Sequence, residues 1–170
     1  AGQRMSVVKR RGKYLLLRFD TGHLLIHLGM SGNLRVLEKH SAPAKHDHVD
    51  LDFNDGPCLR FTDPRRFGAV LWIDSEIDQH PLLAKLGPEP LSEAFDGGYL
   101  FKRSRKRNMP IKTFIMDQAV VVGVGNIYAN EALHIAGIRP DRKAGSISQK
   151  RYLKFADAIV VTLSSAIEQG

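Results

Sequence analysis

The hydrophobic pattern of this chain changes its period near Asp74, and that change constrains the fold more than any other feature. Residues 7–74 contain short apolar runs broken by turn residues, and 45–53 alternates almost strictly between polar and apolar side chains. Such runs are typical of antiparallel strands. From Ile111 onward the apolar spacing is helical, and 149–169 repeats one apolar face over its whole length. We therefore expect an α+β protein, an antiparallel β-sandwich followed by a helical domain.

The individual elements follow from these runs. We expect strands over 14–19, 23–28, 34–37, 45–53, 58–62 and 69–73, and helical segments over 77–86, 111–117, 127–137 and 149–169. Gly87-Pro88-Glu89-Pro90 interrupts regular secondary structure between the two halves. The sequence thus predicts a sandwich domain over 1–74, a linker over 75–95 and a helical domain over 96–170.

The stretch 117–131 is the most informative part of the helical half. Gly123 and Gly125 permit a tight turn, Asn126 stands where a helix cap belongs, and Gly137 is the expected helix stop. Free amides at a new helix N-terminus favour an anion. Most such turns bind nothing, but cations flank this one on both sides, namely Lys102, Arg103, Arg105, Lys106, Arg107 and Lys112 upstream and Arg139, Arg142 and Lys143 downstream.

Charge and cysteine content narrow the function classes. The formal net charge of +7 fits a polyanionic partner such as nucleic acid. The single cysteine, Cys58, excludes an internal disulfide and a multi-cysteine zinc site within the chain, and it fits a reducing compartment. No apolar run is long enough for a membrane span, and the first residues lack a signal-peptide core.

Two glycine-punctuated loops lie in the strand half. His27-Leu28-Gly29-Met30-Ser31-Gly32 places Met30 at a turn, where it is either core filler or an exposed apolar tip. Thr62-Asp63-Pro64-Arg65-Arg66-Phe67-Gly68 places Phe67 beside two arginines. A nucleic-acid-binding protein uses such loops as a wedge that fills the gap left by a displaced base.

His46 and His48 share a strand face with Asp50 and could bind a metal ion. No further histidine or cysteine stands near them in the sequence, so a phosphate contact is the preferred interpretation.

These blocks together resemble bacterial formamidopyrimidine-DNA glycosylase, a repair enzyme for oxidised purines. The resemblance is carried by Lys13–Leu17, His27–Gly32, Lys45–Asp50, Thr62–Gly68, Leu86–Leu91 and Val121–Glu131, in the family's order. It implies a helix–two-turn–helix motif in the helical domain. It also implies a monomer that bends duplex DNA containing oxidised purines or abasic sites, flips the damaged base, excises it and nicks the strand by elimination. A cytoplasmic, nucleoid-associated location follows.

The resemblance also implies roles for single residues. Lys13 matches the proton donor for β-elimination, and the crowding of Arg10 and Arg11 around it suits that role. The other matches are DNA contacts at His46, Arg65 and Arg107, phosphate contacts at His27, Asn126 and Lys112, and an intercalating wedge of Met30, Arg65 and Phe67.

The chain departs from the family pattern at both ends. The family's nucleophile is an N-terminal proline followed by a glutamate, whereas this chain begins Ala1-Gly2. The family also ends in a four-cysteine zinc finger, so zinc belongs to that missing finger and we expect no cofactor here. We therefore expect that these residues do not excise a base unaided. Two alternatives stay open, a non-catalytic module for damaged DNA and a basic protein that binds RNA or an acidic partner.

Overall fold

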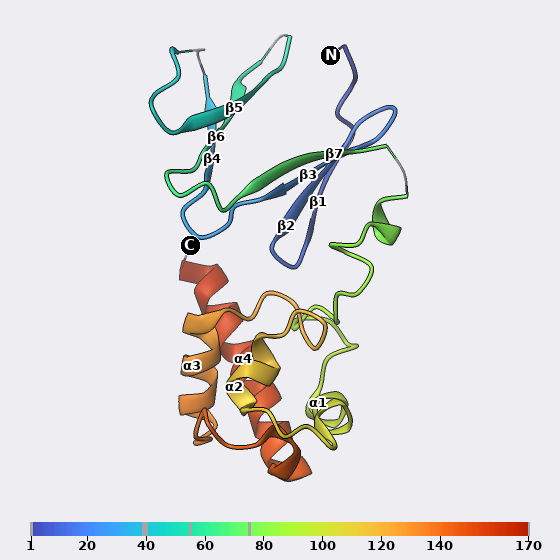
Figure 1. Ribbon diagram of the computed structural model, residues 1–170, viewed down its shortest axis with the longest axis vertical. Helices are drawn as coiled ribbons and strands as arrows, with labels where there is room; N and C mark the ends of the chain where they lie inside the picture. The colour runs from blue at the N-terminus through green and yellow to red at the C-terminus, as the bar shows by residue number, and fades with distance from the viewer. Residues whose placement is uncertain (1, 39–40, 55, 75, 170) are drawn as a thin grey trace. The chain divides into compact units, whose positions relative to one another are not determined.

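The computed structural model describes residues 2–38, 41–54, 56–74 and 76–169. The chain divides into two compact units, unit 1 from Ala1 to His80 and unit 2 from Pro81 to Gly170. Among the described residues, all the strands lie in unit 1 and the four α-helices lie in unit 2 (Figure 1). The expected α+β class, with the strands first, is confirmed.

Unit 1 contains two antiparallel sheets. The first has the order β1-β2-β3-β7, formed by Val7–Arg11, Tyr14–Arg18, His23–His27 and Ala69–Ile73. The second has the order β4-β6-β5, formed by Asn33–Leu37, Cys58–Thr62 and Asp47–Asp52. Side chains alternate along each strand, and the inward-facing ones make one shared apolar core around Leu17, Leu24, Ile26 and Phe61. The predicted sandwich is therefore confirmed.

Strand β5 departs from the strict alternation that its sequence predicts. Its pairing with β6 shifts register between Asp47 and Val49. A bulge of this kind puts an extra residue on one strand, and both Asp47 and Asp50 consequently reach the same partner, Arg60. Strict alternation over 45–53 would put Asp47 and Asp50 on opposite faces, so the expected alternation is wrong at the bulge between Asp47 and Val49.

The expected helix over 77–86 is also wrong. Only a 3₁₀ turn, η1 (Ile77–Gln79), forms there, and His80 is extended with φ −61° and ψ 135°. Because His80 precedes Pro81, the proline ring disfavours a helical conformation at His80.

Unit 2 is built around its last helix. The helices are α1 (Gly97–Ser104), α2 (Ile111–Met116), α3 (Asn126–Ile135) and α4 (Gln149–Gln169), with a 3₁₀ turn η2 (Ala144–Ser146). Helix α4 contacts α1 and α3, and its side chains Tyr152, Phe155 and Ile159 are fully buried in the core of the unit.

The apolar face predicted for α4 is shorter than its sequence suggests. Leu163 still packs on the core, but Ile167 is 68% exposed. Helix α3, a partner of α4, is only ten residues long, so the end of the 21-residue α4 extends past the core. Within the described ranges, no helix is long and apolar enough to cross a membrane.

Candidate nucleic-acid interface

The two glycine-punctuated loops of unit 1 are joined by one buried carboxylate. Asp63, with no exposed surface, lies at the start of the loop between β6 and β7. Its Oδ1 accepts a hydrogen bond of 2.7 Å from the Ser31 hydroxyl in the loop between β3 and β4. The N–H groups of Arg65 and Gly68 donate to the same carboxylate at 3.2 and 2.7 Å. These hydrogen bonds lower the pKa of Asp63, and the bond from Ser31 is the largest cause.

The backbones of the two loops touch, and only glycine permits the contact. Gly29 has a φ of +67°, and a Cβ there would lie 2.6 Å from the Gly68 nitrogen. A Cβ at Gly68 would lie 2.5 Å from the ring of Phe61 and 2.8 Å from the carbonyl oxygen of His27. These separations are far below van der Waals contact, so no side chain fits between the two loops, which we call the paired loops (28–32 and 63–68).

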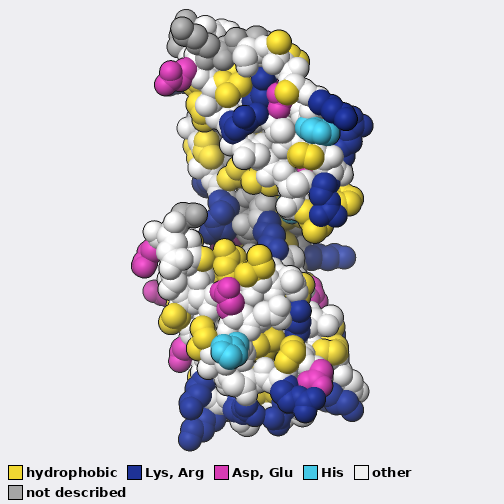
Figure 2. Space-filling model, turned by 90° about the vertical axis from the view of Figure 1, so that its left-hand side faces the viewer, with side chains coloured by type: hydrophobic (Ala, Val, Ile, Leu, Met, Phe, Trp, Pro, Cys, Tyr) yellow, Lys and Arg dark blue, Asp and Glu magenta, His cyan; other side chains and the backbone are white. Residues whose placement is uncertain are grey.

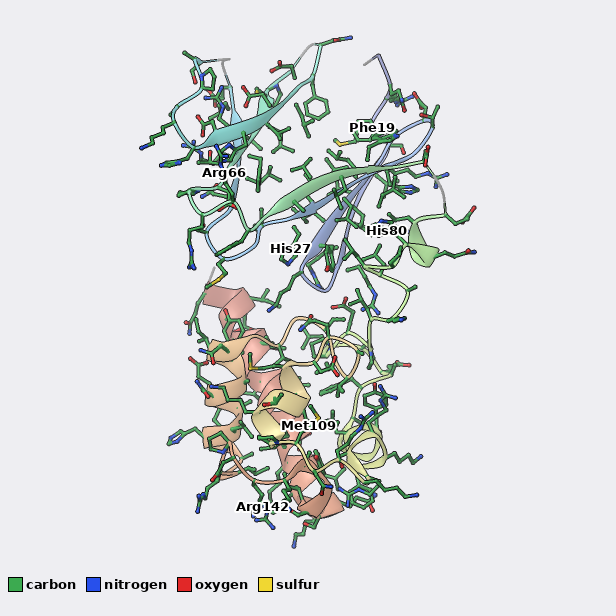
Figure 3. The ribbon with its side chains drawn as sticks, in the orientation of Figure 1. Phe19, His27, Arg66, His80, Met109 and Arg142 are labelled. Atoms are coloured by element: carbon green, nitrogen blue, oxygen red, sulfur yellow. The ribbon has the colours of Figure 1, made fainter. Side chains whose placement is uncertain are left out.

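The side chains predicted to form a wedge project from the paired loops. Met30 is 72% exposed and Phe67 is 56% exposed. The Arg65 guanidinium carbon lies 4.8 Å from the centre of the Phe67 ring, a cation–π contact. Neighbouring Arg66 adopts a φ of +57° and is labelled in Figure 3. The structure thus rules out a core-filler role for Met30, and intercalation by this trio stays a prediction.

Lys13 and His27 meet at one end of the first sheet. Tyr14 of β2 pairs with His27 of β3, and their rings lie 5.0 Å apart. Lys13 is exposed in the turn before Tyr14, and its charge acts on His27. The N–H of Gly29 donates to Nδ1 of His27 at 3.1 Å, so in the neutral ring Nε2 carries the proton. His27 is labelled in Figure 3. Its pKa is lowered mainly by burial and secondly by the Lys13 charge, so the ring is an uncharged hydrogen-bond donor at neutral pH.

We predict that Lys13→Ala raises the pKa of His27 but leaves it below about 6.5, because burial is the larger cause. A titration of the His27 ring by NMR checks this. Lys9→Ala serves as control, since Lys9 pairs with Leu16, two positions along the ladder from Tyr14. The lowered pKa means that the unfolded state binds more protons, so His27 costs stability as pH falls from 6.5 through its folded pKa. An unchanged titration in Lys13→Ala would contradict the contact.

The backbone of His46 is hydrogen-bonded to the paired loops. Its carbonyl oxygen accepts the N–H of Asp63 at 2.9 Å, and Nε2 of His48 lies 2.9 Å from the Asp63 carbonyl oxygen. Asp50 is engaged by the Arg60 guanidinium at 2.7 and 2.8 Å. No cluster of three or more His, Cys, Asp or Glu side chains in the described part of the chain can hold a metal ion. His48 and Asp50 thus bond within the protein, and a phosphate contact by His46 stays a prediction.

Arg60 is a residue whose importance the sequence analysis missed. It is only 3% exposed and pairs with Asp47 and Asp50. It also donates to the carbonyl oxygens of Ser41 at 2.6 Å and Ala42 at 3.4 Å, so it anchors the segment that leads to His46. The signal was present in the sequence as an arginine inside the apolar strand 58–62, opposite the acidic residues of 47–52.

In unit 2, Lys112 and Asn126 line the same hollow. This hollow has a volume of about 630 Å³ and is lined by Met109, Lys112, Thr113, Met116, Asp117 and Asn126. The structure therefore brings together two of the predicted phosphate contacts from α2 and α3.

The turn that leads into α3 differs from its prediction in two details. Asn126 is not the helix cap, because the helix begins at Asn126 and Gly125 occupies the cap position without a side-chain bond. The exposed Asn126 amide is thus available to a ligand. Gly123 has a left-handed φ of +82°, which favours glycine in the predicted turn, but Gly125 has φ −101°, which any residue adopts.

Two of the flanking cations are structural rather than free for a ligand. Arg105 lies 3.9 Å above the Phe101 ring and donates to the carbonyl oxygens of Gly145 and Ile147 at 2.8 and 3.0 Å. Arg103 donates to the carbonyl oxygen of Ala119. Arg107 is exposed but does not line the hollow. Cations from neighbouring positions in the sequence thus have different roles.

Comparisons with known proteins agree with this geometry. Residues 1–70 match the family model described as the formamidopyrimidine-DNA glycosylase N-terminal domain, and residues 86–170 match the model of the H2TH domain of the same family. The chain is 58% identical over 170 residues to a formamidopyrimidine-DNA glycosylase of Acidithiobacillus ferrooxidans and 59% identical to that of Stutzerimonas stutzeri. It spans 63% of the length of each of these relatives.

Solved structures show the same likeness. The Lactococcus lactis Fpg in complex with DNA containing an abasic site superposes with a TM-score of 0.91 at 32% identity, covering 98% of this chain and 62% of that one. The MutM (Fpg) protein of Thermus thermophilus superposes with a TM-score of 0.88 at 38% identity, covering 98% and 61%.

Proposed function

The chain belongs to the formamidopyrimidine-DNA glycosylase family, and on that premise we propose that it is the DNA-gripping body of a glycosylase and abasic-site lyase for oxidised purines. The substrate is duplex DNA with 8-oxoguanine, a formamidopyrimidine or an abasic site. Because the chain spans 63% of the length of its relatives, excision and nicking are part of the proposal. The relatives are bacterial, and we place the protein in the cytoplasm on the nucleoid.

One observation carries this proposal, the exposed apolar tip of the paired loops. Solvent-exposed Met30 and Phe67 cost free energy in water unless a partner covers them. Unstacked base pairs offer an apolar partner of suitable shape, and the adjacent Arg65 supplies a cation for a phosphate or base edge. Flipping a base costs a few kcal/mol. Side chains inserted into the base stack offset this cost.

The remaining predicted residues act on phosphates. The neutral His27 ring offers its Nε2–H as a donor for a phosphate, since Nδ1 already accepts from Gly29. Lys112 and Asn126 in the hollow of unit 2 supply a cation and an amide donor. Exposed Arg107 and half-buried His46 complete the set.

Lys13 is the residue to which we assign chemistry. Strand nicking by β-elimination breaks the C3′–O bond of an abasic sugar, and it requires a group that moves a proton. Exposed Lys13 stands beside His27, a proposed phosphate contact, so it is placed to reach a sugar whose phosphate is bound there. The mechanism proposed for this chain uses no metal or cofactor.

Binding of matched oligonucleotides tests the proposal. We expect the chain to bind an abasic-site duplex about tenfold more tightly than an intact duplex of the same sequence, because no stacked base has to be displaced at the abasic site. Fluorescence anisotropy at fixed salt measures both affinities, with single-stranded DNA and RNA of equal length as competitors. Equal affinity for the two duplexes contradicts the assignment, and preferential binding of RNA shows that the substrate is wrong.

A second candidate function, a non-catalytic module for damaged DNA, is favoured by the fact that all the proposed contacts except Lys13 act by binding alone. Borohydride trapping on an abasic-site duplex separates the two functions. A covalent adduct or a nicked strand that is lost in Lys13→Ala supports the lyase. Selective binding without an adduct or a nick supports the module.

A further inference from the structure

Two basic segments of unit 2 that are distant in sequence lie side by side. The N–H groups of Ile111 and Lys112 donate to the carbonyl oxygens of Arg142 and Pro140 at 2.8 and 3.2 Å. In the opposite direction, the N–H groups of Ala144 and Gly145 donate to the carbonyl oxygens of Met109 and Arg107 at 3.0 and 2.9 Å. Pro110 and Lys143 form an antiparallel bridge between them. The loop before α2 and the loop before α4 are therefore held together over their length.

This backbone ladder collects four exposed cations, Lys106, Arg107, Arg142 and Lys143, which we call the basic ladder. In the described part of the chain, no carboxylate pairs with any of the four. Neighbouring Arg139 is different, because its guanidinium lies 2.7 Å from Asp141 and is neutralised by it. In Figure 2, Lys and Arg side chains gather at the lower end of unit 2, where Figure 3 labels Arg142.

Lys112 connects the basic ladder with the hollow that it lines together with Asn126. Its N–H donates to the carbonyl oxygen of Pro140, in the loop that carries Arg142 and Lys143. Helix α2 has six residues and so spans only about 9 Å. The first two amides of α2 are already bonded to the carbonyl oxygens of Arg142 and Pro140. Attraction for an anion at this end of α2 must come from the side chains.

We propose that the basic ladder is a second phosphate-contact surface, in which Arg142 and Lys143 extend the grip of Lys112 and Asn126 to neighbouring phosphates of the same duplex. This inference rests on the proposed function and names two contacts beyond it. Exposed cations without carboxylate partners fit a phosphodiester backbone, because each contact releases condensed counterions and makes binding dependent on salt.

The salt dependence of binding tests the proposal. The affinity for a labelled abasic-site duplex is measured by anisotropy between 50 and 200 mM salt. The slope of log K against log salt is negative, and each lost phosphate contact reduces its magnitude by about 0.9. We expect Lys143→Gln to lower it by about 0.9 and Arg142→Gln/Lys143→Gln by about 1.8, so that the wild-type advantage over the double variant is about 12-fold larger at 50 mM than at 200 mM.

Two further variants make the result specific. Lys154→Gln removes the same charge from an exposed position on α4 and is expected to leave the slope unchanged, and Asn126→Ala reports on the hollow. The ladder residues retain their backbone bonds in every variant, and thermal melting verifies the fold. If Asn126→Ala weakens binding while the ladder variants keep the wild-type slope, the ladder proposal is overturned and the proposed function stands. If the wild-type chain binds no duplex, both are overturned.

Discussion

Asp63→Ala is expected to lower the melting temperature of unit 1 by roughly 10 °C. The substitution leaves the Ser31 hydroxyl and the amides of Arg65 and Gly68 without their acceptor. Donors that lose their acceptor at a part-buried site are costly, and a domain of this size is sensitive to small losses. Scanning calorimetry measures the shift. Asp78→Ala is the matched control, since Asp78 is an exposed carboxylate of the same unit, and we expect it to melt within about 2 °C of wild type.

The dependence on pH identifies the carboxylate as the cause. The folded pKa of Asp63 is lowered, so its ionised form stabilises unit 1 above the unfolded value of about 3.8, and that stabilisation is lost as pH falls through the folded pKa. Asp63→Asn should therefore differ most from wild type near neutral pH, and the difference should shrink in acid. A constant difference at every pH would contradict a role for the charge.

Losing Asp63 should also remove discrimination between damaged and intact DNA. Met30 and Phe67 are held at their relative positions because Ser31 and the amides of the other loop share one acceptor. Without that acceptor the paired loops separate, and Met30 and Phe67 no longer keep one fixed arrangement that can insert into the base stack. We expect the abasic-site preference to fall before overall affinity does, since the phosphate contacts of unit 2 do not involve Asp63.

The sequence predicted those parts of the fold whose signal is local. Strands 58–62 and 69–73 and helix 149–169 have the predicted bounds, because turn residues flank both strands and the helix repeats one apolar face over many turns. The sequence could not place Asp63 at the junction of two loops, since its partner Ser31 is 32 residues away. The bulge at Asp47 and the carbonyl contacts of Arg105 likewise depend on tertiary neighbours.

In the candidate site too, local features could be predicted from the sequence and tertiary contacts could not. Met30 and Phe67 could be selected from the sequence as unusual loop residues, but only the structure establishes that both are exposed and that their loops touch at Gly29 and Gly68. The basic residues of unit 2 looked equivalent in sequence. The fold separates them into half-buried arginines that bond to backbone carbonyls, such as Arg105, and exposed cations such as Lys143.

Phe67→Ala should weaken binding of an abasic-site duplex by about tenfold, since stacking of a base on an aromatic ring contributes roughly 1–3 kcal/mol. Binding of intact duplex and of single strands should change little. The ring is more than half exposed, so its truncation leaves no cavity and should shift the melting temperature by less than about 2 °C. Val36→Ala, which truncates an exposed apolar side chain of β4, is the control. Equal losses on every substrate, or a large fall in melting temperature, would show that Phe67 is a core residue.

A double-mutant cycle with Met30→Ala then tests whether the two side chains act as one wedge. Their loops are in contact at Gly29 and Gly68, so both side chains should enter the same gap in the base stack. The second truncation should therefore cost less than the first, with a coupling energy of about 0.5 kcal/mol or more. Additive losses on the abasic-site duplex would instead place Met30 and Phe67 at separate positions on the DNA, and the paired loops would no longer explain lesion recognition.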